Sequence, residues 1–202
     1  MAAPIQHVGR FWTEGSFKQP KQRIVLEEIA SAYTDEKLHR VLLPFLTEEE
    51  GGTGRVSKRD MDWLVTNYCK KYNVTYYWRE HPTWPESLIV LHDKYRTWLR
   101  QYRRYMFDIF CRGQRIYFNL DNKRYETTVG QLHFLHWADK YGVLQYLLDN
   151  YEAIAKDHRE RQAQARKDKK KSSGMKRKRQ ELTPAPQPTC TIFTKKMEFR
   201  WV

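Results

Sequence analysis

The chain has 202 residues, which fits one domain with an extension, at roughly 150 residues per domain. Aromatic residues make up 14% of the chain, which is enough to form a core although 30% of the residues are charged. No run approaches the ~18 apolar residues of a membrane-spanning helix, and no signal-peptide pattern is seen, so we expect a soluble intracellular protein. The cysteines, Cys69, Cys111 and Cys190, are far apart and odd in number, which favours neither a disulfide framework nor a metal knuckle.

The net charge of +13 is concentrated in one segment. Residues 156–180 contain twelve Lys or Arg and three acids, a net charge of +9, which leaves +4 for the rest of the chain. The densest part of this segment consists of Lys167, Lys169, Lys170, Lys171, Lys176, Arg177, Lys178 and Arg179. This pattern is typical of a bipartite nuclear import signal or a phosphate-binding arm. The alternative is a solvated tail, which would still bind polyanions weakly and with a steep dependence on salt.

Residues 1–56 are expected to form an N-terminal arm followed by short helices. The arm, residues 1–22, carries Phe11, Trp12 and Phe17 among Gly and Pro without a period. Because disordered segments are usually poor in aromatics, these rings would dock either on the body or on a partner. Residues 23–33 and 35–46 then have the rough apolar spacing of two helices.

Residues 57–155 are expected to form a helical core that includes a hairpin. Ser57 would cap a helix that runs to Tyr72, with Asp60 near the N3 position, where a carboxylate favours the exposed amides. Residues 74–78 have the composition of a strand.

The most regular helical pattern extends from residue 87 to about residue 111. Its apolar stripe consists of Leu91, Tyr95, Trp98, Tyr102, Tyr105 and Ile109. At 100° per residue, the opposite face carries a strip of four arginines, Arg96, Arg100, Arg103 and Arg104. Such a strip is either a solvated face or a row of phosphate contacts. The absence of interleaved acids favours phosphate contacts.

The segment from residue 115 to residue 154 predicts a hairpin followed by two helices. Residues 115–120 and 124–128 would pair across a turn at 121–123, since apolar and polar residues alternate in the first strand. Thr127 or Thr128 would cap the first helix, and Gly142 would end it before the second.

Beyond the core, residues 156–190 are expected to form a basic extension and a Pro-rich linker, and residues 191–202 a terminal strand. The alternation in 191–201 would allow this strand to join the hairpin at 115–128 in one sheet. The fold class is therefore expected to be α+β, mainly helical, with a small sheet.

The two helices at 129–154 also resemble a DNA-binding helix-turn-helix unit. Ala138 and Gly142 fall at the positions where such a unit requires a small residue and a turn. However, the second helix would present Gln145, Asp149 and Asn150, and an acid is unfavourable next to DNA. Two packed helices with a Gly cap are also common in any helical core.

No catalytic, nucleotide-binding or metal-binding motif is found, so an enzyme is not expected and no cofactor is predicted. His133 and His136 lie three residues apart on one predicted helix, a spacing that suits two metal ligands. Without a neighbouring acid or Cys in the sequence, packed or surface histidines are the preferred interpretation, and no metal site is predicted.

Several stretches together resemble an uncharacterised protein family of nucleocytoplasmic large DNA viruses. They are Asp62–Tyr68 with Lys70-Lys71, Phe110–Arg112 before Arg115-Ile116, Thr127–Leu132 with Phe134 and Trp137, and the Lys176–Arg179 run with Glu181-Leu182 and the terminal strand. The likeness covers roughly residues 57–202. Members usually carry Asn and Phe in place of His133 and Leu135. The resemblance implies a viral origin and brings no catalytic residue with it.

We therefore expect a non-enzymatic protein that binds nucleic acid, DNA in the first instance, or another polyanion. The expected phosphate contacts come from the arginine strip and the basic extension. The alternative is a minor capsid or scaffold protein whose aromatic arm and terminal strand bind other virion proteins, since a strand can add to the edge of a partner's sheet. The expected location is the host nucleus, a cytoplasmic virus factory or the virion, with no membrane partner.

Overall fold

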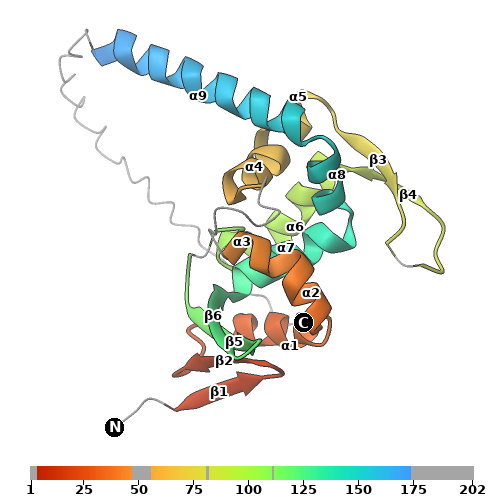
Figure 1. The fold of residues 1–202 in the computed structure, drawn as a ribbon, viewed down its shortest axis with the longest axis vertical. Coiled ribbons are helices and arrows are strands. Elements are labelled where there is room, and N and C mark those ends of the chain that lie inside the picture. Colours follow the sequence, from red (N-terminus) through yellow and green to blue (C-terminus); the bar gives the residue numbers. More distant parts are fainter. Residues whose placement is uncertain (1–3, 47–55, 81, 111, 174–202) are drawn as a thin grey trace, which may run out of the picture. The chain divides into compact units, whose positions relative to one another are not determined.

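The computed structural model describes residues 4–46, 56–80, 82–110 and 112–173, which form a mainly helical α+β fold (Figure 1). By its internal contacts the chain separates into two units, residues 1–163 and 164–202. The sheets and the helical core belong to the first unit. The second contains the C-terminal part of the last helix. The expected fold class is confirmed.

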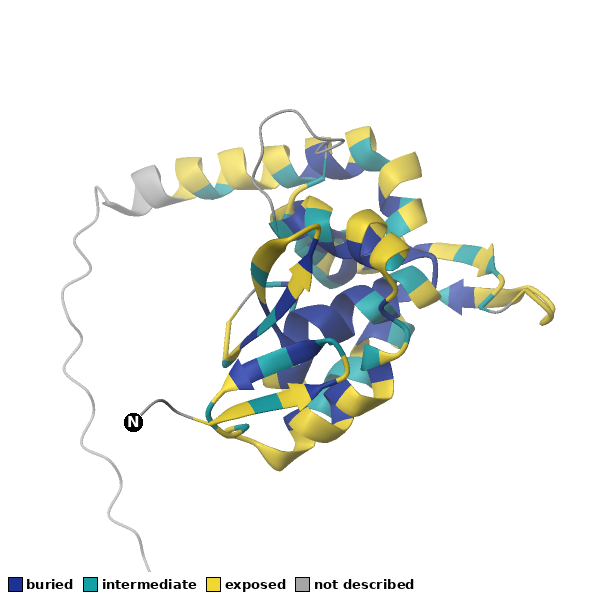
Figure 2. Ribbon diagram, turned by 60° about the horizontal axis from the view of Figure 1, so that its bottom comes forward, coloured by how far each residue is buried: buried dark blue, intermediate teal, exposed yellow. Residues whose placement is uncertain are grey.

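The larger sheet has four antiparallel strands in the order β1-β2-β5-β6. Strands β1 (Ile5–Val8) and β2 (Phe11–Glu14) form one hairpin, and β5 (Arg115–Leu120) and β6 (Lys123–Thr128) form the other. The hairpins meet where β2 lies beside β5, with Trp12 opposite Tyr117. One face of this sheet faces the core, because alternate residues of β2 and β5 are buried (Figure 2).

The prediction that residues 1–22 form an arm without regular structure was therefore wrong. Among the described residues of this segment, 5–14 form a hairpin of the sheet, and α1 begins at Pro20. Phe11 is fully buried, with its ring 5.7 Å from Phe118 and 5.8 Å from Tyr33, so that it docks on the body of this chain. The expected terminal strand, residues 191–201, lies outside the described residues.

The β5–β6 hairpin and the helix after it are confirmed. Asp121 and Asn122 form the two-residue turn with φ values of 50° and 59°, the signature of a type I′ turn. The hydroxyl of Thr128 accepts a hydrogen bond from the amide of Gln131 and so caps helix α7 (Val129–Lys140).

Helix α7 is the centre of the core, and Figure 2 shows it buried behind the sheet. Leu132, Leu135, Trp137 and Ala138 have no exposed surface. Helix α1 (Pro20–Ala30) packs on it, as does the continuous helical run of α2 (Asp35–Lys37), η1 (Leu38–Leu42) and α3 (Leu43–Leu46). These helices confirm the expectation for residues 23–46.

A second helical run consists of α4 (Lys58–Trp63), η2 (Leu64–Tyr68) and α5 (Cys69–Lys71). Ser57 caps it as predicted, since its hydroxyl accepts a hydrogen bond from the amide of Asp60 at 3.1 Å. The hydroxyl also donates to the Asp60 carboxylate at 2.7 Å. Both runs contain one π-helical turn, in η1 and η2, where the hydrogen bonds span five residues.

Strands β3 (Thr75–Trp78) and β4 (Ser87–Val90) form a separate two-stranded sheet. Helix α6 (Leu91–Met106) follows β4 directly. The helix predicted from residue 87 therefore begins four residues later. Ser87–Val90 pairs with β3, a partner that no local pattern reveals.

Gly142 has a φ of 69° and separates α7 from α8 (Val143–Asp149), as predicted. Helix α9 (Tyr151–Ser173) follows and extends from the first unit into the second. Within the first unit, the buried Asp157 fixes the start of this helix, because its carboxylate accepts hydrogen bonds from Trp63 and Tyr72.

Candidate nucleic-acid interface

One face of α6 is exposed because the opposite face packs against aromatic residues of the core. Leu91 and Tyr95 are buried. Further along the helix, the rings of Trp98 and Tyr102 lie 5.3 Å and 4.3 Å from the ring of the buried His133 on α7. These contacts fix the rotation of the helix, so that its arginines point away from the core.

All four predicted arginines, Arg96, Arg100, Arg103 and Arg104, are exposed. Arg96 and Arg100 lie one turn apart on the regular part of the helix, and so share a face. Within the ranges that the structure describes, no carboxylate lies within ion-pair distance of any of the four guanidinium groups. Their charge is therefore not neutralised by direct pairing there.

The strip is not continuous, which corrects the sequence prediction. Arg103 has a φ of 57° and a ψ of 167°, a backbone conformation outside the helical region that kinks α6. The rule of 100° per residue fails beyond this point. Tyr105, which was assigned to the apolar stripe, is 40% exposed. Arg104 lines a pocket at the end of the helix instead of continuing the row.

This pocket, which we call the α6 pocket, has a volume of about 310 Å³. Its charged residues are Asp62 on α4, Arg104 on α6, and Asp108 and Arg112 in the segment after α6. The remaining lining residues are Thr66, Tyr95, Phe107, Ile109, Phe110 and Phe134. It is therefore a small pocket with aromatic walls and two charges of each sign.

The two acids of the α6 pocket differ in their partners. Asp108 forms a bidentate pair with Arg112, with N–O distances of 2.8 and 2.9 Å. Asp62 is half-buried, and no hydrogen bond or ion pair to its carboxylate is found in the described part of the chain. Burial and the neighbouring charge of Asp108 raise the pKa of Asp62, and Arg104 and Arg112 partly offset this.

Sequence reasoning missed the α6 pocket. The sequence singled out Asp62 as part of the viral resemblance, and its proximity to Asp108 was not predicted. A signal was nevertheless present, because the segments that carry the viral resemblance meet here. Asp62 and Thr66 come from the first segment and Phe110 and Arg112 from the second, while Phe134 follows the third.

The basic extension is described only in part. Lys167 is exposed on α9, and Lys169, Lys170 and Lys171 fall within the bounds of the same helix. The predicted site residues Lys176, Arg177, Lys178 and Arg179 lie outside the described residues.

The α7–α8 pair has the turn of a helix-turn-helix unit, but its second helix has no basic surface. α8 is seven residues long, and its exposed residues are Gln145, Leu148 and Asp149. The indole nitrogen of Trp78 donates to the carbonyl of Lys140 at 2.9 Å, so that the β3–β4 hairpin is held against the turn. The pair is built as part of the core.

The two histidines of α7 have partners within the protein. Nδ1 of the buried His133 lies 2.9 Å from the carbonyl of Met106. Nδ1 of His136 lies 3.4 Å from the Lys37 ammonium. Across the described ranges, no group of three or more His, Cys, Asp or Glu side chains could hold a metal ion. No described helix is long and apolar enough to cross a membrane.

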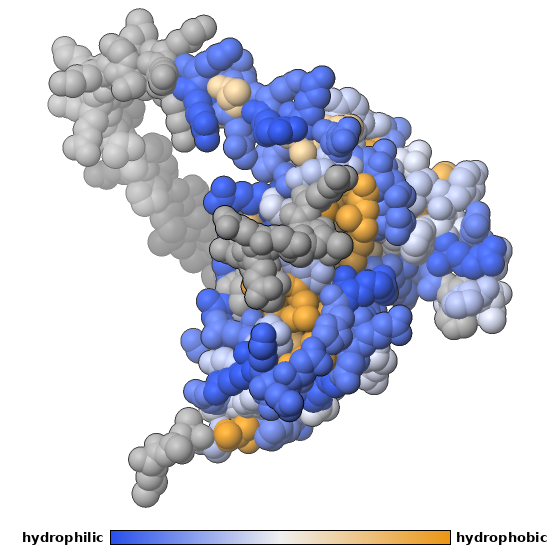
Figure 3. Space-filling model, in the orientation of Figure 1, coloured by the Kyte–Doolittle hydropathy of each residue, from blue (hydrophilic) through white to orange (hydrophobic). Residues whose placement is uncertain are grey.

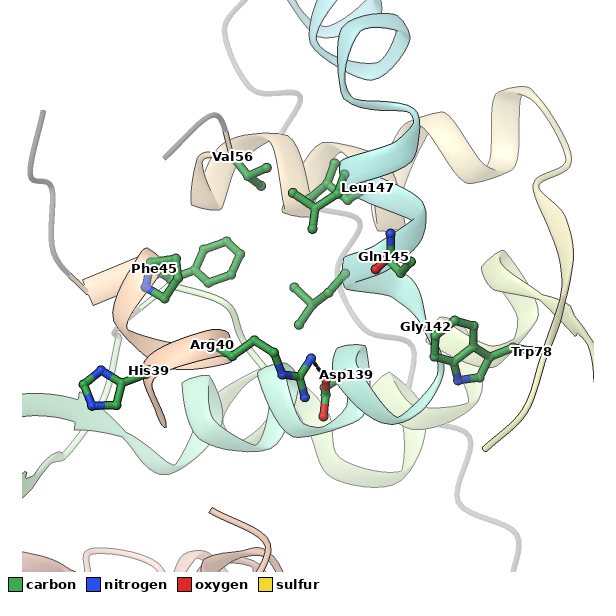
Figure 4. Close-up of a pocket in the computed structure, with 12 residues that line it drawn as sticks. His39, Arg40, Phe45, Val56, Trp78, Asp139, Gly142, Gln145 and Leu147 are labelled. Atoms are coloured by element: carbon green, nitrogen blue, oxygen red, sulfur yellow. Dashed lines mark ion pairs between the residues drawn. The ribbon is translucent and has the colours of Figure 1, made fainter. Parts of the chain in front are cut away.

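A second pocket, with a volume of about 730 Å³, lies at α3 and α8 (Figure 4). Phe45, Val56 and Leu147 line its apolar part, and an ion pair of 2.9 Å between Arg40 and Asp139 lies at its edge. Figure 3 shows apolar surface in the middle of this side of the molecule. The ionisable residues that line this pocket in the described part of the chain are paired: Asp139 binds both Arg40 and Lys37, and His39 lies 3.1 Å from Asp121.

Comparison with known proteins identifies the family. Residues 12–189 match a family described as "Family of unknown function (DUF7197)". The chain belongs to this family. It is also 27% identical over 148 residues to "Uncharacterized protein L507" of Acanthamoeba polyphaga mimivirus. That match covers 70% of this chain and 55% of the relative, so the chain spans about half the length of the relative. No solved structure matches the chain.

The relationship to proteins of giant viruses, which the sequence indicated, is confirmed. The range of residues that the resemblance covers needs correction. The family match begins at residue 12 and not near residue 57, and it ends at residue 189, before the expected terminal strand. The fold accounts for the N-terminal extension of the match, because β2 and the helices after it are packed into the same core.

Proposed function

We propose that this chain is a non-enzymatic nucleic-acid-binding protein of a large DNA virus. It contacts the phosphate backbone through the exposed arginines of α6 and, separately, through the basic residues of its C-terminal extension. Its place of action is then where viral genomes are handled, in the host nucleus, a cytoplasmic virus factory or the virion.

The observation that carries the proposal is the exposure of Arg96, Arg100 and Arg103 without a paired carboxylate among the described residues. Arginines that serve only solubility usually alternate with acids, which would form ion pairs along the helix. Other exposed arginines of this chain do have such partners, for example Arg23 with Glu27 at 2.8 Å. An unneutralised group of guanidiniums provides the charge-assisted donors that phosphate oxygens require.

The extension supports the proposal independently. Residues 156–180 carry a net charge of +9. A segment of this charge neutralises several phosphates, and each neutralised phosphate releases bound counterions. The affinity is then expected to fall steeply with salt, whatever the base sequence.

Fluorescence anisotropy with labelled single- and double-stranded oligonucleotides, titrated with salt, tests the proposal. The triple variant Arg96→Gln, Arg100→Gln, Arg103→Gln is expected to bind at least about tenfold more weakly at low salt. It should also lower the salt slope by roughly two to three units. The control is Lys18→Gln, Lys21→Gln, Lys123→Gln, which removes the same charge from exposed positions outside α6 and should change the slope much less.

The extension is tested by replacing Lys167, Lys169–Lys171 and Lys176–Arg179 with Gln in the full chain. The expected result is a further loss of affinity and a shallower slope. The proposal fails if the unmodified chain binds no oligonucleotide at low salt, or if the α6 triple variant and its control lose affinity equally.

The alternative, a minor capsid or virion scaffold protein, has lost part of its support. The aromatic arm on which it rested is a hairpin of the sheet, with Phe11 in the core. Its second element, the strand at 191–201, lies outside the described residues. Recovery of the protein at fixed stoichiometry with capsid subunits, away from the genome, would favour it.

A further inference from the structure

The α6 pocket contains a carboxylate and a guanidinium that the protein leaves available for a ligand. Of its four charged groups, Asp108 and Arg112 already satisfy each other through two hydrogen bonds. The amide of Asp108 also donates to the carbonyl of Gly130 at 3.2 Å, which fixes this pair against α7. The carboxylate of Asp62 and the guanidinium of Arg104 have no hydrogen bond or ion pair in the described part of the chain.

The backbone is strained at the residue that positions Arg104. A non-glycine residue with a φ of 57° and a ψ of 167° lies outside the regions that L-residues favour, so this conformation is strained. The kink at Arg103 separates Arg104 from the arginines of the regular helix and places it at the α6 pocket with Asp62. Strain of this kind often persists where it builds a site.

Aromatic residues form the floor of the α6 pocket, and the ring of Phe110 is partly accessible beside it. Phe107 and Phe134 are buried, with ring centroids 5.1 Å apart. Phe110 is half-buried, and the Arg112 guanidinium lies 4.9 Å from its ring centroid. A volume of about 310 Å³ is at the lower end of the range for small-molecule sites, which fits one base better than a larger ligand.

The charges of Asp62 and Arg104 select among flat ligands. A carboxylate accepts two parallel hydrogen bonds from adjacent N–H groups, and a guanidinium donates to ring nitrogen or carbonyl acceptors. Guanine carries both features, with N–H groups at N1 and N2 and acceptors at O6 and N7. In a duplex the N1 and N2 edge is already paired, so only an unpaired guanine can offer it.

We propose that the α6 pocket binds an unpaired guanine base of a single-stranded nucleic acid, with Asp62 accepting from the base N–H groups and Arg104 donating to its acceptors. This inference rests on the proposed function, because the neighbouring arginines, Arg100 and Arg103, hold the phosphates of the same strand. It adds that the protein selects single strands and one base. The raised pKa of Asp62 agrees with this assignment, because a half-buried carboxylate gains from ligand donors.

The test uses the full chain and four DNA heptamers that are all thymidine except for a central thymidine, guanosine, inosine or cytidine. Inosine lacks the 2-amino group, so it measures the N2 contact alone. The unmodified chain is expected to bind the guanosine heptamer roughly tenfold more tightly than the all-thymidine heptamer, with inosine in between. Asp62→Asn should bring the affinities for the four heptamers within about twofold of one another, without changing the dependence of affinity on salt.

Arg104→Gln should reduce the preference for guanosine, and Asp93→Asn, at an exposed acid in the first turn of the same helix, should preserve it. An unchanged salt slope and an unchanged thermal unfolding midpoint show that Asp62→Asn is folded. The inference is overturned if the unmodified chain binds the four heptamers equally, or if Asp62→Asn keeps the preference. Equal binding with a steep salt slope removes only the base pocket, whereas no binding of any heptamer at low salt removes the proposed function as well.

Discussion

The indole nitrogen of Trp63 donates a 2.9 Å hydrogen bond to the carboxylate of Asp157, 94 residues further along the chain. The same carboxylate accepts a hydrogen bond of 2.9 Å from the hydroxyl of Tyr72 and forms an ion pair with Lys71. Burial raises the pKa of Asp157, but the hydrogen bonds from these three donors outweigh burial and hold it below its ordinary value. Asp157 is thus a charged anchor between α9 and the α4–α5 run.

Replacement of Asp157 by Asn is expected to lower the free energy of unfolding at pH 7 by about 1–3 kcal/mol, because three donors lose a charged acceptor. Since the folded-state pKa is depressed, the contribution of Asp157 is complete above the ordinary carboxyl pKa. It is lost as the pH falls through the folded value. Urea unfolding at pH 7 and below pH 4 measures both effects. Glu152→Gln, at an exposed position of α9, should change the free energy by less than about 0.5 kcal/mol.

His136 should make stability depend on mildly acidic pH. Burial first, and then the charge of Lys37, lower its pKa from 6.5 to about 4. Because the unfolded chain binds the proton more readily, the stabilisation is complete above about pH 6.5 and is lost as the pH falls towards 4. The shift corresponds to about 3 kcal/mol. His136→Gln should flatten the curve of unfolding free energy against pH in this window, whereas His7→Gln, at an exposed position, should leave it unchanged.

Gly142→Ala is expected to cost more than about 2 kcal/mol of unfolding free energy. Its φ of 69° disfavours a side chain, and a Cβ there would lie 2.3 Å from Cδ2 of Trp78. Gly15→Ala is the matched control, because Gly15 also has a positive φ, 83°, but no atom within 4 Å of the added Cβ. It should show the backbone cost alone, about 1 kcal/mol. Equal losses in the two variants would contradict the predicted clash with Trp78.

Two substitutions in the turn of the β5–β6 hairpin should change the stability of the protein in opposite directions. Asn122 has a φ of 59°, which glycine adopts without strain and a β-branched residue does not. Asn122→Gly should therefore leave the unfolding free energy unchanged or raise it by up to about 1 kcal/mol. Asn122→Val should lower it by about 1–2 kcal/mol. Thermal unfolding of the three proteins gives the order, and a valine variant as stable as the glycine variant would rule out the type I′ assignment.

Elements that depend on neighbouring residues were predictable from the sequence. The β5–β6 hairpin, the Thr128 cap and the Gly142 turn all follow from residues within a few positions of one another. The N-terminal hairpin was not predictable, because its strands have four residues each and β2 finds its partner about a hundred residues later. β4 was hidden for the same reason, since Leu88–Val90 continues the apolar spacing of α6.

The candidate site was predictable only to the extent that α6 is a regular helix. Arg96 and Arg100 lie where the period of the helix puts them. Arg104 does not, because the backbone of Arg103 departs from the helix without a glycine or proline to signal it. The proximity of Asp62 and Asp108 depends on how α4 packs against the segment after α6, and no local periodicity in the sequence predicts it.

The pairing of β2 with β5 also constrains the order in which the protein can fold on the ribosome. Phe11 is synthesised early, but its neighbour Phe118 is added more than a hundred residues later. At ~5–20 residues per second, the first hairpin waits several seconds with its apolar face and one strand edge uncovered. Unpaired edges of this kind favour association between nascent chains. In this chain the four-stranded sheet can therefore be completed only after β5 has been synthesised.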